Sequence, residues 1–185
     1  YLTLFGILYI LIYLTFGAIQ ENRAEFVGKF ISNLRGHNGK NLTVKPSLGN
    51  LFLWKTIYED SGFYYVDAVR LFANSEYCQG TKIKKLDLLN DFSELDKKSQ
   101  QYKDLKRFNW FSQGYLGKGI VENIITDVRY SAVPNEVDGL WGIRINLNKT
   151  ASDHIDWVVN RRNYLEKWNR FFDLLLGKNC QDLIN

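Results

Sequence analysis

The sequence predicts an α+β protein in which an N-terminal transmembrane helix precedes an antiparallel sheet of two β-hairpins, in the order ββαββα, with helices on one face. Three observations support this fold class. The first 20 residues carry no charge, two pairs of segments alternate between apolar and polar residues, and two other segments repeat apolar residues every three or four positions. Strands that occur in pairs between helices favour an antiparallel sheet.

The composition is that of a folded protein. Of the 185 residues, 45% are hydrophobic and 15% are aromatic, and the net charge is +4. This apolar content is sufficient for a hydrophobic core, and the charge is too small for a typical nucleic-acid-binding protein. We therefore expect no nucleic-acid partner.

The two cysteines, Cys78 and Cys180, lie about a hundred residues apart and form no CxxC motif. We expect two unpaired thiols, and this spacing does not predict a metal site built on cysteine. The alternative is a disulfide, which would require an oxidising compartment.

The first segment, Tyr1–Gln20, is expected to cross a membrane. Its 20 residues match the thickness of a bilayer's hydrocarbon core at about 1.5 Å of helix per residue. A signal peptide would need a basic start and a cleavage site, and a buried core helix would need internal partners for three tyrosine hydroxyls. Because the sequence starts inside this apolar segment and contains no Met, we expect it to be part of a longer polypeptide. The predicted organisation is a transmembrane helix (1–20), an amphipathic helical extension (21–38) and a soluble α+β domain (39–185).

The extension carries apolar residues on one helical face and ends at Gly36 and Gly39. We expect this face either to dock on the globular domain or to lie at the lipid headgroups; its residues are Phe26, Val27, Phe30, Ile31 and Leu34. Four basic residues follow the apolar segment within about 20 positions, which favours a cytoplasmic location for the domain.

The soluble domain is organised around a hairpin within Trp54–Phe72 that turns at Ser61-Gly62. A short strand is expected at Asn41–Lys45, before this hairpin, and a polar loop at Asn74–Gly80, after it. The remaining expected elements are a strand within Lys82–Leu89, a helix at Ser93–Gln113, a second hairpin made of Ile124–Val133 and Leu140–Leu147, and a helix from Ser152 or Asp153 to Leu176.

Motifs for catalysis or cofactor binding are scarce. The only histidines, His37 and His154, are not in a metal-binding spacing, and the sequence contains neither GxxxxGK[ST] nor GxGxxG. We therefore assign no catalytic residue, no metal ligand and no cofactor to this sequence.

Strand parity identifies one candidate binding site. Asp127 and Arg129 share a face of one expected strand, and Arg144 and Asn146 share a face of its expected partner. If these faces coincide, two guanidinium groups converge and could hold a phosphate or carboxylate, with Asp127 orienting Arg129. The alternative is a cross-strand ion pair on a solvated sheet face.

Four segments carry a resemblance to a known family: VKPSLGNLFLWKTIYED, YYVDAVRLF, ITDVRYSA and LWGIRINL. The sequence from about Leu42 to Leu147 resembles the C-terminal part of bacterial inner-membrane proteins described as membrane-bound metal-dependent hydrolases. The most specific pieces are PSLGNLFLW and Asp-x-Arg-Tyr. The positions that match the family pattern, without an assigned role, are Pro46, Asn50, Trp54, Asp127 and Arg129.

The resemblance implies that this is the soluble C-terminal domain of such a hydrolase. In that family the metal-dependent name rests on a histidine motif in the N-terminal membrane half, and residues 1–40 contain no counterpart. The resemblance therefore implies a divalent metal bound by an N-terminal membrane half that lies outside this sequence. It also implies a bacterial inner-membrane location, with the bilayer and that half as partners. The alternative function is a non-catalytic, membrane-anchored binding domain.

Overall fold

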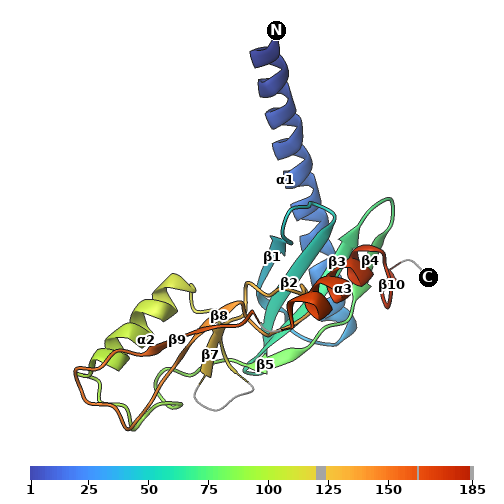
Figure 1. Cartoon of the computed structure of the whole chain (residues 1–185). Coiled ribbons are helices and arrows are strands. Elements are labelled where there is room, and N and C mark those ends of the chain that lie inside the picture. Colours follow the sequence, from blue (N-terminus) through green and yellow to red (C-terminus); the bar gives the residue numbers. More distant parts are fainter. Residues whose placement is uncertain (120–123, 162, 184–185) are drawn as a thin grey trace.

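The computed structural model describes residues 1–119, 124–161 and 163–183. A long N-terminal helix, α1 (Leu2–Leu34), projects from a body made of two antiparallel sheets and two shorter helices, α2 (Gln100–Phe111) and α3 (Tyr164–Leu175) (Figure 1). The prediction of an α+β fold with antiparallel pairing is confirmed. The prediction of one sheet built from two hairpins is wrong, because the two hairpins belong to separate sheets.

The first sheet has six strands in the order β1-β2-β3-β4-β10, and β5 also pairs with β3. Their bounds are β1 Lys40–Pro46, β2 Leu53–Asp60, β3 Phe63–Leu71, β4 Ser75–Cys78, β5 Lys82–Lys84 and β10 Gln181–Asp182. The second sheet has four strands in the order β6-β7-β8-β9. Their bounds are β6 Leu116–Lys118, β7 Ile124–Asp127, β8 Trp141–Arg144 and β9 Asp156–Val159.

The central hairpin of β2 and β3 is confirmed, with its turn at Ser61-Gly62. Both turn residues have a positive φ, 49° and 79°, which matches the twist of tightly connected antiparallel strands. Trp54 pairs with Val69 across the hairpin, and both side chains are buried in a cluster with α1. The adjacent residue, Leu53, is buried in a different cluster that includes α3.

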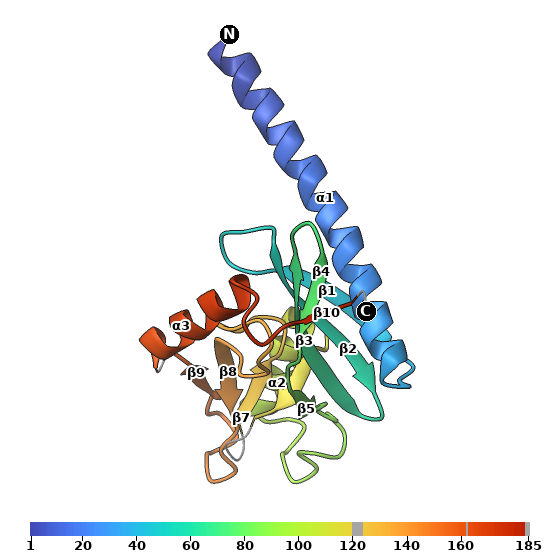
Figure 2. The same ribbon diagram turned by 90° about the vertical axis from the view of Figure 1, so that its right-hand side faces the viewer.

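Helices therefore cover both faces of the first sheet, with α1 on one side and α3 on the other (Figure 2). The expectation that all helices share one face is wrong. It rested on a single sheet, whereas α2 packs on the second sheet through Leu105 and Phe108, which are buried against Ile125 and Ile143.

The helix α1 has two parts with different surroundings. Its apolar window has a mean hydropathy of 2.2 and no buried residue, so it is not the core helix of this body. An exposed apolar helix of this length suits a membrane anchor or a signal segment. The second half docks on the first sheet through a stripe of mostly small residues: Gln20, Ala24, Val27, Gly28, Ile31 and Ser32.

This stripe corrects the predicted apolar face of the extension. Val27 and Ile31 are buried as expected, but Phe26, Phe30 and Leu34 are 72%, 40% and 63% exposed. The helix approaches the sheet closely, since a Cβ on Gly28 would lie 2.9 Å from a methyl group of Leu42. A larger side chain does not fit at Gly28, and the packed face combines small residues with Gln20 and Ile31, which are both 1% exposed.

Several predicted boundaries are wrong because local patterns continue beyond the hydrogen-bonded elements. The predicted loop 74–80 contains the strand β4, and the predicted strand 82–89 is paired over β5 and through one further bridge from Lys85 to Gly117. The helix predicted from Ser93 starts at Gln100, after an N-cap at Ser99 whose Oγ accepts a hydrogen bond from the Tyr102 amide at 3.2 Å. The helix predicted from Ser152 is instead a strand, β9, followed by α3. The second hairpin is confirmed as β7 paired with β8, although both strands are shorter than predicted.

The two cysteines are joined in a disulfide between Cys78 at the end of β4 and Cys180 after α3. The expectation of two unpaired thiols is wrong. The sheet brings together chain segments that are 102 residues apart, which cysteine spacing does not reveal. The neighbouring pairing of β10 with β4 holds the same two segments together.

Candidate functional site

Asp127 and Arg129, two of the predicted site residues, contact each other and are almost fully buried, with exposed fractions of 0% and 6%. The Arg129 Nε and Nη2 atoms donate to the two Asp127 carboxylate oxygens at 3.0 and 2.8 Å. The same guanidinium also donates to the Gln113 Oε1 atom and to the Phe111 carbonyl oxygen. Four of the five N–H groups of the Arg129 guanidinium therefore have protein acceptors.

The structure does not bring Arg144 or Asn146 to this pair. Arg144 is exposed on β8 opposite Ile124, the first residue of β7, whereas Arg129 follows the last residue of β7. Asn146 exchanges two hydrogen bonds through its backbone with the Gln101 side chain. The strand ends at Asp127 and the chain turns, so strand parity does not extend to Arg129. The role of these residues in anion binding stays a prediction.

Of the five positions that match the family pattern, Asp127 and Arg129 form the buried pair described above, and the other three lie in or beside the connection between β1 and β2. The Asn50 Oδ1 atom accepts hydrogen bonds from the Phe52 and Leu53 amides at 3.0 and 2.8 Å. The buried Trp54 donates from its indole nitrogen to the Leu51 carbonyl oxygen at 2.8 Å. Pro46 ends β1. These contacts fix the shape of the connection.

Beside this connection lies a cavity of about 520 Å³, which we call the α3 cavity. Its walls come from the β1–β2 connection, the segment that follows β7, and α3. The apolar part of the lining is Pro46, Leu48, Tyr130, Ala132, Pro134, Leu140, Tyr164, Trp168 and Phe171. An apolar cavity with a few converging polar groups is the usual form of a small-molecule site.

Lys55, in the middle of β2, lies at this cavity with only 3% of its surface exposed. Its Nζ atom donates to the Ser131 Oγ atom at 2.8 Å and to the Glu136 carbonyl oxygen at 2.7 Å. Burial lowers the pKa of Lys55 to about 7, against the opposing effect of the Glu136 and Asp127 charges. The Lys55 side chain is therefore charged in a substantial fraction of the molecules near neutral pH.

All charged side chains that line the α3 cavity are cationic. They are Lys45, Lys55, Arg129, Arg161 and Lys167. Two of them are already neutralised, Arg129 by Asp127 and Lys167 by Asp138 at 3.1 Å. Within the described residues, no carboxylate lies within 4.0 Å of a nitrogen of the other three, so the lining has unpaired positive charge.

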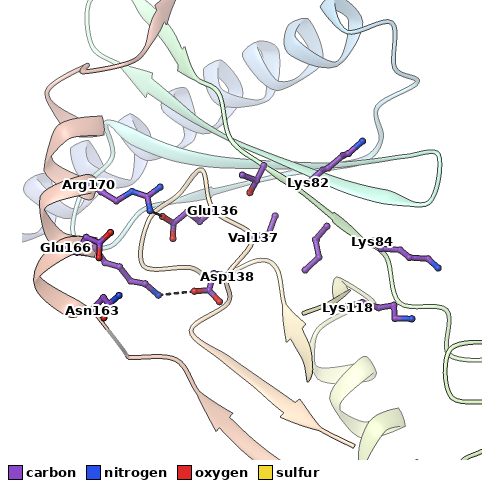
Figure 3. A pocket seen from close by; sticks show the side chains of 12 residues that line it. Lys82, Lys84, Lys118, Glu136, Val137, Asp138, Asn163, Glu166 and Arg170 are labelled. Atoms are coloured by element: carbon purple, nitrogen blue, oxygen red, sulfur yellow. Dashed lines mark hydrogen bonds and ion pairs between the residues drawn. The ribbon is translucent and has the colours of Figure 1, made fainter. Parts of the chain in front are cut away.

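A second cavity, of about 580 Å³, lies between α3 and β5 and has a mixed charge (Figure 3). Glu136 and Asp138 pair with Arg170 and Lys167 from α3. Burial raises the pKa of Glu136, although the charge of Arg170 opposes this shift. Besides these ion pairs, Lys118 pairs with Asp91, so the remaining charged groups of the lining are Lys82, Lys84 and Glu166.

Sequence reasoning missed Lys55 and the α3 cavity. The available signal was the position of Lys55 between Leu53 and Ile57 on one face of a strand whose opposite face is also apolar. A lysine on such a face must be buried, but the sequence does not reveal what surrounds it.

Within 1–119, 124–161 and 163–183, no group of three or more His, Cys, Asp or Glu residues is placed to hold a metal ion. A scan against protein-family models and searches of curated proteins and solved structures find no match to this chain.

Proposed function

We propose that this chain is a membrane-anchored binding domain that takes up an anionic group carrying an apolar tail in the α3 cavity. The observation that supports this function best is the buried Lys55, which has hydrogen-bond partners but no carboxylate partner. Burial disfavours the charged form of Lys55, and the charges of Glu136 and Asp127 offset this cost only in part, since the pKa stays lowered. Groups with such shifted pKa values concentrate at binding and catalytic sites. An anion in the cavity would stabilise the charged form further.

The lining supports both parts of this ligand. Lys45 and Arg161 add cationic charge without carboxylate partners, and the rings of Tyr130, Tyr164 and Trp168 provide apolar walls. A cationic group inside a cavity of low dielectric attracts an anion more strongly than the same group in water. We therefore propose a ligand with a phosphate or carboxylate head at Lys55 and a hydrocarbon tail along α3.

The disulfide supports a location outside the cytoplasm, since such bonds persist in oxidising compartments. We propose that α1 anchors the chain in the bacterial inner membrane with the body on the extracytoplasmic side. This replaces the cytoplasmic location, which rested on four basic residues after the apolar segment.

The metal-dependent hydrolysis implied by the family resemblance stays a prediction. The described residues offer no cluster of metal ligands, so such activity would depend on ligands from another part of the protein or from a partner. The binding function does not require this metal.

The test is isothermal titration of the chain in lipid nanodiscs with hexyl phosphate, compared with hexyltrimethylammonium and inorganic phosphate. Hexyl phosphate should bind best. Hexanesulfonate, whose single charge does not change between pH 6 and pH 8.5, should bind more tightly at pH 6, because Lys55 is charged below its pKa of about 7. Lys55→Met should weaken binding about tenfold or more, since a charge-assisted hydrogen bond is lost.

The matched control is Lys178→Met, which removes an exposed lysine that pairs with Asp173 outside the cavity. This variant should bind hexyl phosphate like the unaltered chain. Equal binding of the cationic analogue, or unchanged binding by Lys55→Met, would refute the proposal.

A further inference from the structure

The helix α3 has an apolar surface that is wider than the core needs. Phe171 and Leu174 are buried on the first sheet, at 7% and 6% exposure. Leu165, Phe172 and Leu176 are 78%, 50% and 68% exposed. Their spacing of seven and four residues puts all three on one side of the helix, which we call the outer face of α3.

The polar side of α3 points toward the second cavity. Glu166 and Arg170 line that cavity together with residues of β5 (Figure 3). In both ribbon views β5 lies at the end of the body away from α1, whereas α3 and the β1–β2 connection lie near the end from which α1 projects (Figures 1 and 2). The polar side of α3 therefore faces away from the apolar part of α1, and the outer face lies on another side of the helix.

A continuous series of contacts connects α1 to the C-terminal end of α3. The ring of Phe16 packs on that of Phe52 with 5.7 Å between centroids, and Phe52 stacks on Phe72 at 4.7 Å. The guanidinium of Arg70 lies 4.3 Å from the Phe72 ring centroid, and its Nε atom donates to the Leu175 carbonyl oxygen at 2.8 Å. The end of α3 is thus held close to the level at which the fully exposed apolar part of α1 ends.

We propose that the outer face of α3 lies in the boundary between headgroups and acyl chains of the same bilayer that holds α1. Amphipathic helices bind membranes in this way, with the apolar face buried about 5–10 Å. Leu48, in the β1–β2 connection, is a further exposed apolar residue, at 83%. We assign this contact to the lipid bilayer because α1 emerges from the bilayer beside these residues. This inference rests on the proposed anchoring of α1 in a membrane and is independent of the ligand proposed for the α3 cavity.

The test measures depth in the membrane with single cysteines at Leu165 and Phe172, each labelled with the fluorophore NBD, in the full chain. The native cysteines are joined in a disulfide, and the unaltered chain run through the same reaction reports any background labelling. Each variant is placed in nanodiscs that hold one copy, with and without lipids carrying a nitroxide near the top of the acyl chain. Nitroxide lipids should reduce the emission at both positions by about twofold or more.

Glu166→Cys on the same helix and Lys84→Cys on β5 are the controls, and the nitroxide lipids should leave their emission nearly unchanged. The proposal is overturned if Leu165→Cys and Phe172→Cys behave like these controls, or if all four positions are quenched equally. It is also overturned if the labels become shielded only in nanodiscs that hold two copies, since a second copy would then cover the outer face. Leu165 is the more exposed position, so its variant reports even if Phe172→Cys fails to fold.

Discussion

Breaking the bond between Cys78 and Cys180 should remove a large part of the stability of the body. The bond joins residues 102 positions apart and closes a loop that contains the whole second sheet, α2, α3 and the strand β5 of the first sheet. In the chain-entropy model a loop of about 100 residues contributes about 4.7 kcal/mol at 25 °C by restricting the unfolded chain. The free energy of unfolding of a domain is typically about 5–15 kcal/mol, so this loss is at least about a third of the total free energy of unfolding.

The measurement is urea unfolding of the chain in nonionic detergent, followed by tryptophan fluorescence. With a denaturant dependence of about 2 kcal/mol per molar urea, the midpoint should fall by roughly 2 M. The perturbation is made in two ways, by a reductant on the unaltered chain and by the double substitution Cys78→Ala and Cys180→Ala. Cys78 is 1% exposed in a cluster with Leu53 and Ala68, so the double variant should lose additional packing energy.

The control is the same reductant on the double variant, whose midpoint should not move. The reasoning is refuted if the reductant leaves the midpoint of the unaltered chain unchanged. Detection of two free thiols in the unaltered chain before reduction would also refute the reasoning. Either result would also remove the support for an extracytoplasmic location.

Two further predictions concern buried charges. Asp127→Ala should lower the free energy of unfolding by about 3–5 kcal/mol, because it leaves the buried guanidinium of Arg129 without its counter-charge. The control Arg144→Ala, at an exposed position, should change the free energy of unfolding by about 0.5 kcal/mol or less. Equal urea midpoints for the two variants would contradict this prediction. The pKa of Lys55 is about 7 in the folded state and about 10.4 in an unfolded chain. Between these values the unfolded state binds the additional proton, so the free energy of unfolding should rise with pH. Lys55→Met should abolish this rise in urea titrations at pH 7, 8, 9 and 10; a variant that keeps the slope would disprove the assignment.

Local patterns predicted the elements whose partners are near in sequence. The alternation around Ser61-Gly62 predicted β2 and β3, since a two-residue turn fixes their register without help from the rest of the chain. The uncharged first segment predicted an apolar helix, and the rest of the protein does not bury this helix. The predicted helix 93–113 was longer than α2, and the predicted strand 124–133 was longer than β7. In both cases the amphipathic spacing continues into the turns beside the element.

The α+β class, the apolar N-terminal helix and the central hairpin could be predicted from the sequence, because short-range periodicity and turn chemistry specify these features. The folded structure was needed to show that there are two sheets, that Cys78 bonds Cys180, and that Lys55 lies at a cavity lined by cations. Each of these depends on segments about 75 to 100 residues apart meeting in space, as Lys55 meets Ser131. Such meetings follow from the packing of whole elements, and the residue types near a position do not specify which distant segment it will contact.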